Sequence, residues 1–416
     1  MKMNRIVVSL FAAGVMASPL AHATNGDAMM AVGSQSTALG GTGVANFMGA
    51  ESTFSNPGML AKSKGREATG GIVLFKPKVT NSGMPGGTMS ESSANTNYIP
   101  DFSYSSRIND NLTYGVALAG IAGMGVDFTG APASHVKAKS ALSILKVVPT
   151  IAYNKDDYGI GFSPVLQRGS LMLSYNNGAA YNAAEKADTK ISFGFSFGGF
   201  YNATPEMTVG AAYKSKISAK YGTQISGAGT GFGLCSPAGG PCTGLPTFGD
   251  DLNQPAEISA GVSYAMNDRF TVTADYKLIQ WGSAEGYKDF NWKDQNIIAL
   301  GAKYKADGYW LGAGYNNAND PIENMNSSGL VGSDYRNSAV NMFNNMFFPA
   351  VVKNSFTFGG GYSISPELDV EGAFVLTPQV TKTVQIPHFD QTPTGIITNT
   401  TTHSQRSYSV SLRYKY

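Results

Sequence analysis

A regular alternation of apolar and polar residues runs through most of this chain, and it constrains the fold more than any other feature. Every second residue from Ile258 to Tyr264 is apolar or aromatic, and the same pattern runs from Phe270 to Tyr276. A period of two residues predicts β-strands whose two faces meet different surroundings. We expect about fourteen strands, an even number as in single-chain bacterial β-barrels. They lie near residues 66 to 79, 97 to 107, 111 to 128, 144 to 154, 157 to 174, 189 to 202, 206 to 225, 254 to 266, 269 to 282, 293 to 306, 308 to 318, 353 to 364, 367 to 381 and 404 to 416.

The joins between these segments alternate between short and long. The short joins are polar turns at Asn109-Asp110, Lys155-Asp156-Asp157, Thr204-Pro205-Glu206, Asn267-Asp268, Ala306-Asp307-Gly308 and Ser365-Pro366-Glu367. Membrane barrels have short periplasmic turns and longer outer loops, whereas a soluble β-sandwich has no reason to alternate in this way. We therefore predict an all-β fold, a transmembrane antiparallel β-barrel in the outer membrane of a bacterium. Its last strand ends on the aromatic Tyr416.

Composition agrees with a membrane barrel. Of the 416 residues, 14% are charged and 11% are aromatic, whereas soluble proteins carry about 25% charged residues. The hydrophobic share of 42% excludes an intrinsically disordered chain. A net charge of +2 gives no reason to expect a nucleic-acid partner, and no residue pattern predicts a cofactor.

The N-terminus reads as a secretory signal peptide. Lys2 and Arg5 precede an apolar run from Ile6 to Ala17, and Ala21-His22-Ala23 supplies small residues for cleavage. An uncleaved anchor is the alternative, but the apolar run is too short to span a bilayer. No later segment offers about eighteen consecutive apolar residues. The expected domains are a signal peptide at 1–23, an N-terminal hatch at 24–65 and a barrel at 66–416.

The segment from Ser36 to Ala61 fits neither the leader nor the strands. Its many glycines and small residues suit a compact segment that packs closely against other backbone. Asn56-Pro57-Gly58 supplies a turn, in which proline fixes φ and glycine is free to take a positive φ. We interpret the segment as a plug inside the barrel, and we expect Asn56 to form hydrogen bonds with the barrel wall or with the plug backbone.

On these residues the chain resembles the FadL/TodX-type family of outer-membrane transporters for long-chain fatty acids and other hydrophobic compounds. In that family a small N-terminal hatch with an Asn-Pro-Ala motif fills the lumen, and here Gly58 replaces the alanine. The resemblance continues at Gln254-Pro255-Ala256-Glu257, Trp281-Gly282, Trp292-Lys293-Asp294, Ala299-Leu300-Gly301 and Asn319-Asp320-Pro321-Ile322. It implies a monomer that moves a fatty acid or hydrocarbon passively. Its partners would be the hydrophobic substrate, outer-membrane lipids and the outer-membrane barrel assembly machinery.

Glycines interrupt the third predicted strand. Gly120, Gly123 and Gly125 lie in a segment where β-branched and aromatic residues are favoured. Interior glycine marks bulges and bends, so this strand is predicted to kink. The alternative is that these glycines only allow tight packing against the hatch. The resemblance implies that a kinked third strand makes a lateral opening toward the membrane.

An amphipathic helix is predicted in one outer loop, between Asn337 and Val351. Val340, Phe343, Met346 and Phe347 recur there at helical spacing. Flexible methionine and flat aromatic rings suit a binding groove, although a helix that packs only on its loop neighbours fits equally well. The expected substrate contacts are Met124, Phe128, Phe343, Met346, Phe347 and, for a carboxylate, Lys293. An exposed lysine such as Lys293 is more often simply solvated.

Two cysteines, Cys235 and Cys242, lie in one outer loop, and a local disulfide is predicted because the outer compartment oxidises thiols. Of the histidines, His135, His388 and His403 remain after the leader and are widely separated in predicted outer loops, so no metal site is expected.

An enzymatic function is not expected. Gly194-Phe195-Ser196-Phe197-Gly198 matches the letters of a nucleophile elbow but falls within a predicted strand instead of a strand-to-helix turn. An outer-membrane phospholipase would need serine and histidine on neighbouring strands, within hydrogen-bond reach. The other alternative is a surface receptor or adhesin barrel, and a general porin fits less well because a plug would block it.

Overall fold

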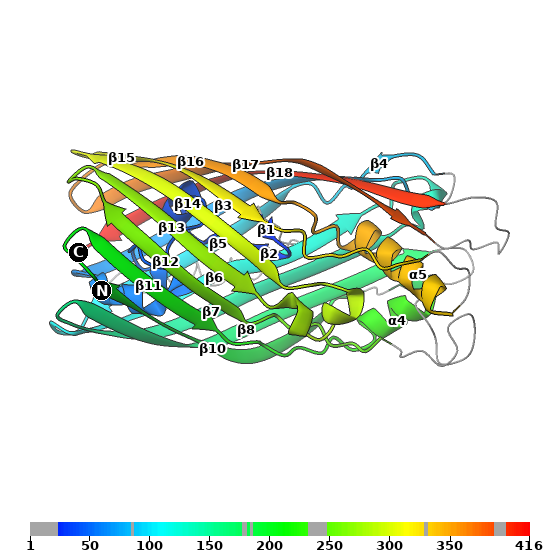
Figure 1. The fold of residues 1–416 in the computed structure, drawn as a ribbon, viewed down its shortest axis with the longest axis horizontal. Coiled ribbons are helices and arrows are strands. Elements are labelled where there is room, and N and C mark those ends of the chain that lie inside the picture. The colour runs from blue at the N-terminus through cyan, green and yellow to red at the C-terminus, as the bar shows by residue number, and fades with distance from the viewer. Residues whose placement is uncertain are drawn as a thin grey trace, which may run out of the picture.

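The computed structural model describes residues 24–84, 87–176, 181–183, 186–231, 248–327, 332–386 and 397–416. Fourteen long antiparallel strands form a closed barrel, in which each strand pairs with the next and the last pairs with the first (Figure 1). These strands are β3 (Arg66–Asn81), β5 (Asn97–Arg107), β6 (Leu112–Asp127), β7 (Lys139–Lys155), β8 (Tyr158–Asn176), β10 (Asp188–Asn202), β11 (Met207–Lys214), β12 (Glu257–Ala265), β13 (Phe270–Ile279), β14 (Gln295–Ala306), β15 (Tyr309–Ala318), β16 (Asn354–Ser363), β17 (Leu368–Gln385) and β18 (Thr398–Lys415). The predicted fold class is confirmed.

Alternating side chains give the barrel an apolar outer face. On β10, Phe193 is 75% exposed and Phe195 is 43% exposed, whereas Ser192 and Ser196 are buried on the inner face. A row of exposed aromatic rings is unfavourable in water. This pattern therefore indicates that the outer face of the strand meets lipid. Ser196, the centre of the nucleophile-elbow letters, is thus an inward-facing residue of a regular strand.

The two ends of the barrel differ. The predicted polar turns close one end, where the C-terminus also lies, and the long loops gather at the other end with α4 (Gln224–Gly231) and α5 (Gly332–Phe347) (Figure 1). The 3-10 turns η2 (Ala133–His135), η3 (Trp281–Ser283) and η4 (Lys288–Phe290) and the short strands β4 (Ser90–Glu91) and β9 (Tyr181–Ala183) belong to this loop end. None of the helices in the described ranges is long and apolar enough to cross a membrane.

Residues before β3 fold inside the barrel. They form β1 (Thr24–Asn25), β2 (Ala28–Met29), α2 (Ser34–Ala38), α3 (Ser52–Ser55) and the 3-10 helix η1 (Pro57–Lys62). Small side chains let this segment lie directly on the wall. Gly40 N donates to Thr357 Oγ1 on β16 at 2.9 Å, and Gly43 N donates to Asp275 Oδ2 on β13 at 2.8 Å. We use the name hatch for residues 24–65.

Four local predictions differ from the structure. The strand predicted from 206 to 225 is much shorter, because β11 ends at Lys214. The loop helix α5 begins at Gly332 and ends at Phe347, earlier than the predicted 337 to 351, because Pro349 cannot continue it. His403, predicted in a loop, lies on β18, which is longer than expected. Gly58 does not have a positive φ, because Asn56-Pro57-Gly58 starts a 3-10 helix instead of an isolated turn.

Candidate functional site

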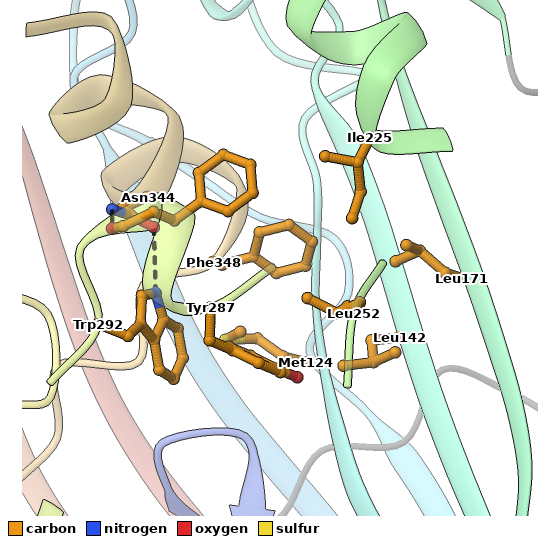
Figure 2. Close-up of a pocket in the computed structure, with 10 residues that line it drawn as sticks. Met124, Leu142, Leu171, Ile225, Leu252, Tyr287, Trp292, Asn344 and Phe348 are labelled. Atoms are coloured by element: carbon orange, nitrogen blue, oxygen red, sulfur yellow. Dashed lines mark hydrogen bonds between the residues drawn. The ribbon is translucent and has the colours of Figure 1, made fainter. Parts of the chain in front are cut away.

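A narrow apolar cavity, with about 20 Å³ of accessible space, lies beneath the outer loops. Figure 2 shows side chains converging on it from α4, α5, the loops and the wall. Its lining residues are Met124, Leu142, Leu171, Ile225, Leu252, Tyr287, Phe290, Trp292, Asn344 and Phe348. We call this space the outer cavity. Nearly all of its lining is hydrocarbon or aromatic, so it suits an apolar guest that leaves water.

Stacked aromatic rings lie behind Phe290, which lines the outer cavity. Phe343 on α5 lies with its ring centroid 4.9 Å from that of Phe290 and 4.8 Å from that of Phe347. Asn344 fixes α5 to the loop, because its Nδ2 donates to Phe290 O at 2.7 Å and its Oδ1 accepts from Trp292 Nε1 at 3.2 Å (Figure 2). These bonds satisfy buried polar groups and hold α5 against the loop beside the cavity.

Below the outer cavity, a polar contact joins the loops to the hatch. The Tyr287 hydroxyl donates to Asp27 Oδ2, and Gln254 Nε2 donates to the Tyr287 oxygen at 3.2 Å. All three side chains are buried, and Asp27 Oδ1 has no hydrogen-bond partner. Burial raises the pKa of Asp27 to about 6, although the Tyr287 hydrogen bond lowers it. We call these three residues the partition.

A second cavity, with about 110 Å³ of accessible space, lies between the hatch and the wall. Its lining includes the apolar Ile121, Val148, Val165, Ile217, Ile279 and Ile297 together with Lys146, Lys214, Lys277 and Glu257. We call it the inner cavity. The partition separates the two spaces, since Tyr287 lines the outer cavity and Gln254 lines the inner one.

The three lysines of the inner cavity differ in their partners. Lys214 Nζ forms an ion pair with Glu257 at 2.9 Å, and Lys277 Nζ donates to Gly41 O at 2.7 Å. Lys146 on β7 has no hydrogen bond or ion pair with any residue that the structure describes. Lys146 therefore lines the inner cavity without a direct partner, and the carboxylates of Glu257 and Asp27 act on its charge only from a distance.

The barrel wall is interrupted between β5 and β6. The two strands pair only as far as Asp101 and Ala119, although β5 continues to Asn97 and β6 to Asp127. The pairing ends at a bulge in β6, where Gly120 opposes Leu145 and Ala122 opposes Ile144, leaving Ile121 without a partner on β7. An extra residue of this kind bends a strand.

The hatch covers part of this interruption. Gly123 N on the free edge of β6 donates to Asp27 O at 2.9 Å, and Ala28 of β2 pairs with Ala122. Further along, Asp127 N donates to Ser92 Oγ at 2.8 Å. The bulge residue Ile121 lines the inner cavity. The inner cavity thus reaches the wall at the place where β5 no longer pairs with β6.

The motif Asn56-Pro57-Gly58 ties the hatch to β10. Asn56 Oδ1 accepts from Gly58 N at 2.9 Å, and its Nδ2 donates to Val44 O at 2.7 Å and to Gly199 O at 2.9 Å. The predicted bonds to the wall and to the hatch backbone are both confirmed. A Cβ on Gly58 would lie 2.7 Å from the carbonyl oxygen of Gly198, so the chain approaches β10 too closely for alanine here.

We expect Asn56→Ala to loosen the hatch without unfolding the barrel. The substitution removes the Asn56 donor to the carbonyls of Val44 and Gly199, at a cost of about 1–3 kcal/mol. Hydrogen exchange of the hatch amides should accelerate about tenfold or more, whereas strand amides keep their protection. The matched control is Asn46→Ala, since Asn46 in the same segment donates only a weak bond to Met48 Sδ among the described residues. Equal exchange in both variants would contradict this role.

A buried charge cluster fixes the hatch at the turn end. The Arg413 guanidinium on β18 bonds Glu51 of the hatch at 3.0 Å, Glu371 of β17 at 3.1 Å and also Glu67 of β3. It donates further to Met48 O at 3.1 Å. Burial raises the pKa of Glu51, and the Glu67 and Glu371 carboxylates raise it further against the pull of Arg413. Hatch docking should therefore weaken as the pH rises above the usual range for a glutamate.

The structure brings together most of the predicted contact residues. Met124 lines the outer cavity, Phe343, Met346 and Phe347 are fully buried on α5 in the same apolar cluster, and Phe128 packs in that cluster against His135. Lys293 is exposed and lines neither cavity. Gly120 and Gly123 flank the bulge, and Gly125 lies further along β6. Cys235, Cys242 and His388 lie outside the described residues.

The histidines that the structure describes show no strand-borne dyad with serine. His403 on β18 bonds Pro349 O at 2.7 Å through Nδ1 and Gln405 at 3.1 Å through Nε2. His135 Nδ1 lies 3.2 Å from the hydroxyl of its chain neighbour Ser134, in a loop turn that lines neither cavity. No group of three His, Cys, Asp or Glu within the described ranges could hold a metal ion.

A family model described as outer membrane protein transport protein (OMPP1/FadL/TodX) matches residues 13–416. The chain belongs to this family. No curated protein sequence matches it significantly. Membership of the FadL/TodX family confirms the resemblance and places the barrel in the outer membrane, with its apolar face toward lipid. It supports transport of hydrophobic compounds and fits a protein that is not an enzyme.

Solved structures share the fold of this FadL/TodX-family chain. A FadL homologue of Pseudomonas aeruginosa is 16% identical with a TM-score of 0.70, covering 94% of this chain and 100% of its own. The toluene transporter TodX of Pseudomonas putida is 18% identical with a TM-score of 0.66, covering 93% and 99%. The toluene transporter TbuX of Ralstonia pickettii is 16% identical with a TM-score of 0.62, covering 93% and 99%.

Proposed function

We propose that this protein carries hydrophobic molecules passively from the cell surface into the outer membrane, through a lateral opening between β5 and β6. The observation that supports this route is the inner cavity, which reaches the unpaired edge of β6 at Ile121. An apolar solute gains nothing from a water-filled channel, but it gains free energy in a dry cavity and again in lipid. No energy source is needed for such a downhill path.

The partition is the barrier on this route. A solute in the outer cavity contacts Tyr287, and further descent requires Tyr287 to release Asp27. The same hatch turn bonds Gly123 on the free edge of β6 through Asp27 O. Displacing the turn therefore opens the way down and uncovers the wall edge in one movement. The hatch need not leave the barrel for this, because its anchors at Asn56 and Arg413 lie elsewhere.

Among hydrophobic molecules, the inner cavity favours those with one anionic group. Lys146 lines this space without a direct hydrogen bond or ion pair to a described residue, and the same lining includes the aliphatic Ile121 and Val148. A carboxylate at the end of an acyl chain would pair with this ammonium, whereas an alkane or arene would leave it uncompensated. We therefore favour long-chain fatty acids over neutral hydrocarbons as the substrate.

The full-length protein reconstituted into liposomes tests this function. We expect faster uptake of a long-chain fatty acid and of an alkane than in empty liposomes, and no acceleration for a small sugar. Lys146→Met should weaken fatty-acid binding about tenfold, as loss of a charge-assisted hydrogen bond predicts, and leave the alkane unaffected. Lys216→Met is the control, because Lys216 is exposed and pairs with Glu285. Uptake of sugar at the fatty-acid rate would refute hydrophobic transport, and equal losses for both solutes would refute carboxylate recognition.

A further inference from the structure

Two basic side chains lie side by side on the lipid-facing surface, at the border of the apolar belt. Arg406 on β18 and Lys76 on β3 are direct cross-strand partners, and both are exposed. Like charges directly opposite one another destabilise a sheet. Neither side chain has an ion pair or hydrogen bond with any residue of the described ranges, so no protein group there relieves this repulsion.

The height of the pair in the membrane follows from the strand pattern. Outward residues of β18 from Tyr416 to Tyr408 are all apolar or aromatic, and each is about half exposed. That stretch matches the roughly 9–11 residues with which a tilted strand crosses the hydrocarbon core. Arg406 is the next outward residue after Tyr408. The pair therefore lies where the acyl chains end, at the loop side of the barrel.

The neighbouring rows support this placement. The last apolar row joins Phe374, Tyr408 and Leu74 across three strands. Beyond the basic pair the outward residues are polar: Lys78, which forms an ion pair with Glu91 at 3.5 Å, and Thr402, whose hydroxyl lies 2.7 Å from that of Thr80. A headgroup at this level meets two free cations with hydroxyl groups above them.

We propose that Arg406 and Lys76 bind a phosphate group on the headgroup of a lipid in the outer leaflet. A phosphate carries enough charge for two cations, and its several oxygens suit the forked guanidinium together with a lysine ammonium. The same strands hold the acyl chains of this lipid against their aromatic belt. A headgroup anion thus replaces the repulsion of the pair with attraction, and the lipid becomes a fixed part of the barrel surface.

The experiment measures thermal unfolding of the purified full-length protein in a neutral detergent, with and without bisphosphorylated lipid A. Lipid A should raise the unfolding temperature of the wild type, since binding stabilises the folded state. In the double variant K76Q/R406Q the apparent affinity should fall roughly thirtyfold, as expected when two membrane-surface cations are removed. Without lipid A this variant should be at least as stable as the wild type, because the like-charge repulsion is gone.

Arg168 provides the matched control. It follows a similar run of exposed apolar residues on β8, but its cross-strand partners are Leu145 and Ile191. R168Q should keep the wild-type response to lipid A, and lipid A without phosphates should not stabilise the wild type. Equal affinity in K76Q/R406Q, an equal loss in R168Q, or equal stabilisation by dephosphorylated lipid A would overturn the proposal. Equal stabilisation by inorganic phosphate alone would overturn the assignment to a lipid.

Discussion

Deletion of Ile121 is expected to reduce uptake of the hydrophobic substrate more than about tenfold, which corresponds to an added barrier of about 1.4 kcal/mol. Ile121 is the residue of β6 that has no partner on β7. Without it, Ala119, Ala122 and Met124 keep their inward positions, but the strand has no reason to bend. A straight β6 can continue its hydrogen-bond ladder with β5 beyond Ala119. This extension is favourable because the bilayer offers no other hydrogen-bond partners to unpaired backbone groups.

Binding at the outer cavity should survive this deletion, and titration with a fluorescent acyl probe measures it separately from uptake. Ile121→Ala is the control, because it retains the extra backbone residue and should transport nearly as well as the wild type. Substitution of all the β6 glycines by valine is less informative, since a Cβ on Gly125 would lie 2.4 Å from the carbonyl oxygen of Ser140. If the deletion variant folds and transports normally, lateral exit at β6 is wrong and passage beside the hatch replaces it.

Replacement of Arg413 with methionine is expected to destabilise the protein by about 3–5 kcal/mol, the usual cost of removing one partner from a buried ion pair. Arg413 supplies the one positive charge among Glu51, Glu67 and Glu371, and without it the charged carboxylates of this group repel one another. Urea unfolding in detergent should show a lower midpoint, and protease should cut the hatch before the barrel opens.

A neighbouring ion pair supplies the control for this variant. Lys415 lies two residues further along β18 and pairs with Asp369, but its side chain is 45% exposed. Lys415→Met should change the stability by less than about 1 kcal/mol, because exposed ion pairs contribute little. Adding Glu51→Gln to Arg413→Met should restore part of the loss by removing one buried charge. A small effect of Arg413→Met, similar to that of Lys415→Met, would show that the cluster does not hold the hatch.

The barrel was predictable because lipid and lumen impose a period of two on every wall strand. The glycines of β6 also predicted an irregularity in this strand. The structure has a bulge there, beside Gly120. The sequence could not place Lys146 at the inner cavity, since an inward lysine on a strand looks the same whether it is paired or free. Lys293 was favoured instead because it lies at the outer end of a predicted strand, but it is exposed.

Long-range contacts were the main features missed. Tyr287 and Asp27 are 260 residues apart, and Arg413 and Glu51 are 362 residues apart, so no local pattern joins them. Their pairing depends on where the hatch lies within the closed barrel. Gly58 was interpreted as a source of conformational freedom, whereas the structure shows that it provides room for the close approach of β10.

The position of Arg413 also sets an order of assembly. Its carboxylate partners come from the first barrel strand, β3, from the neighbouring β17 and from the hatch, while Arg413 itself is on the last strand. This binding site for Glu51 exists only after β18 has paired with β3 and the cylinder has closed. The hatch, although first in the sequence, therefore gains its full set of Arg413-centred contacts only in the closed barrel.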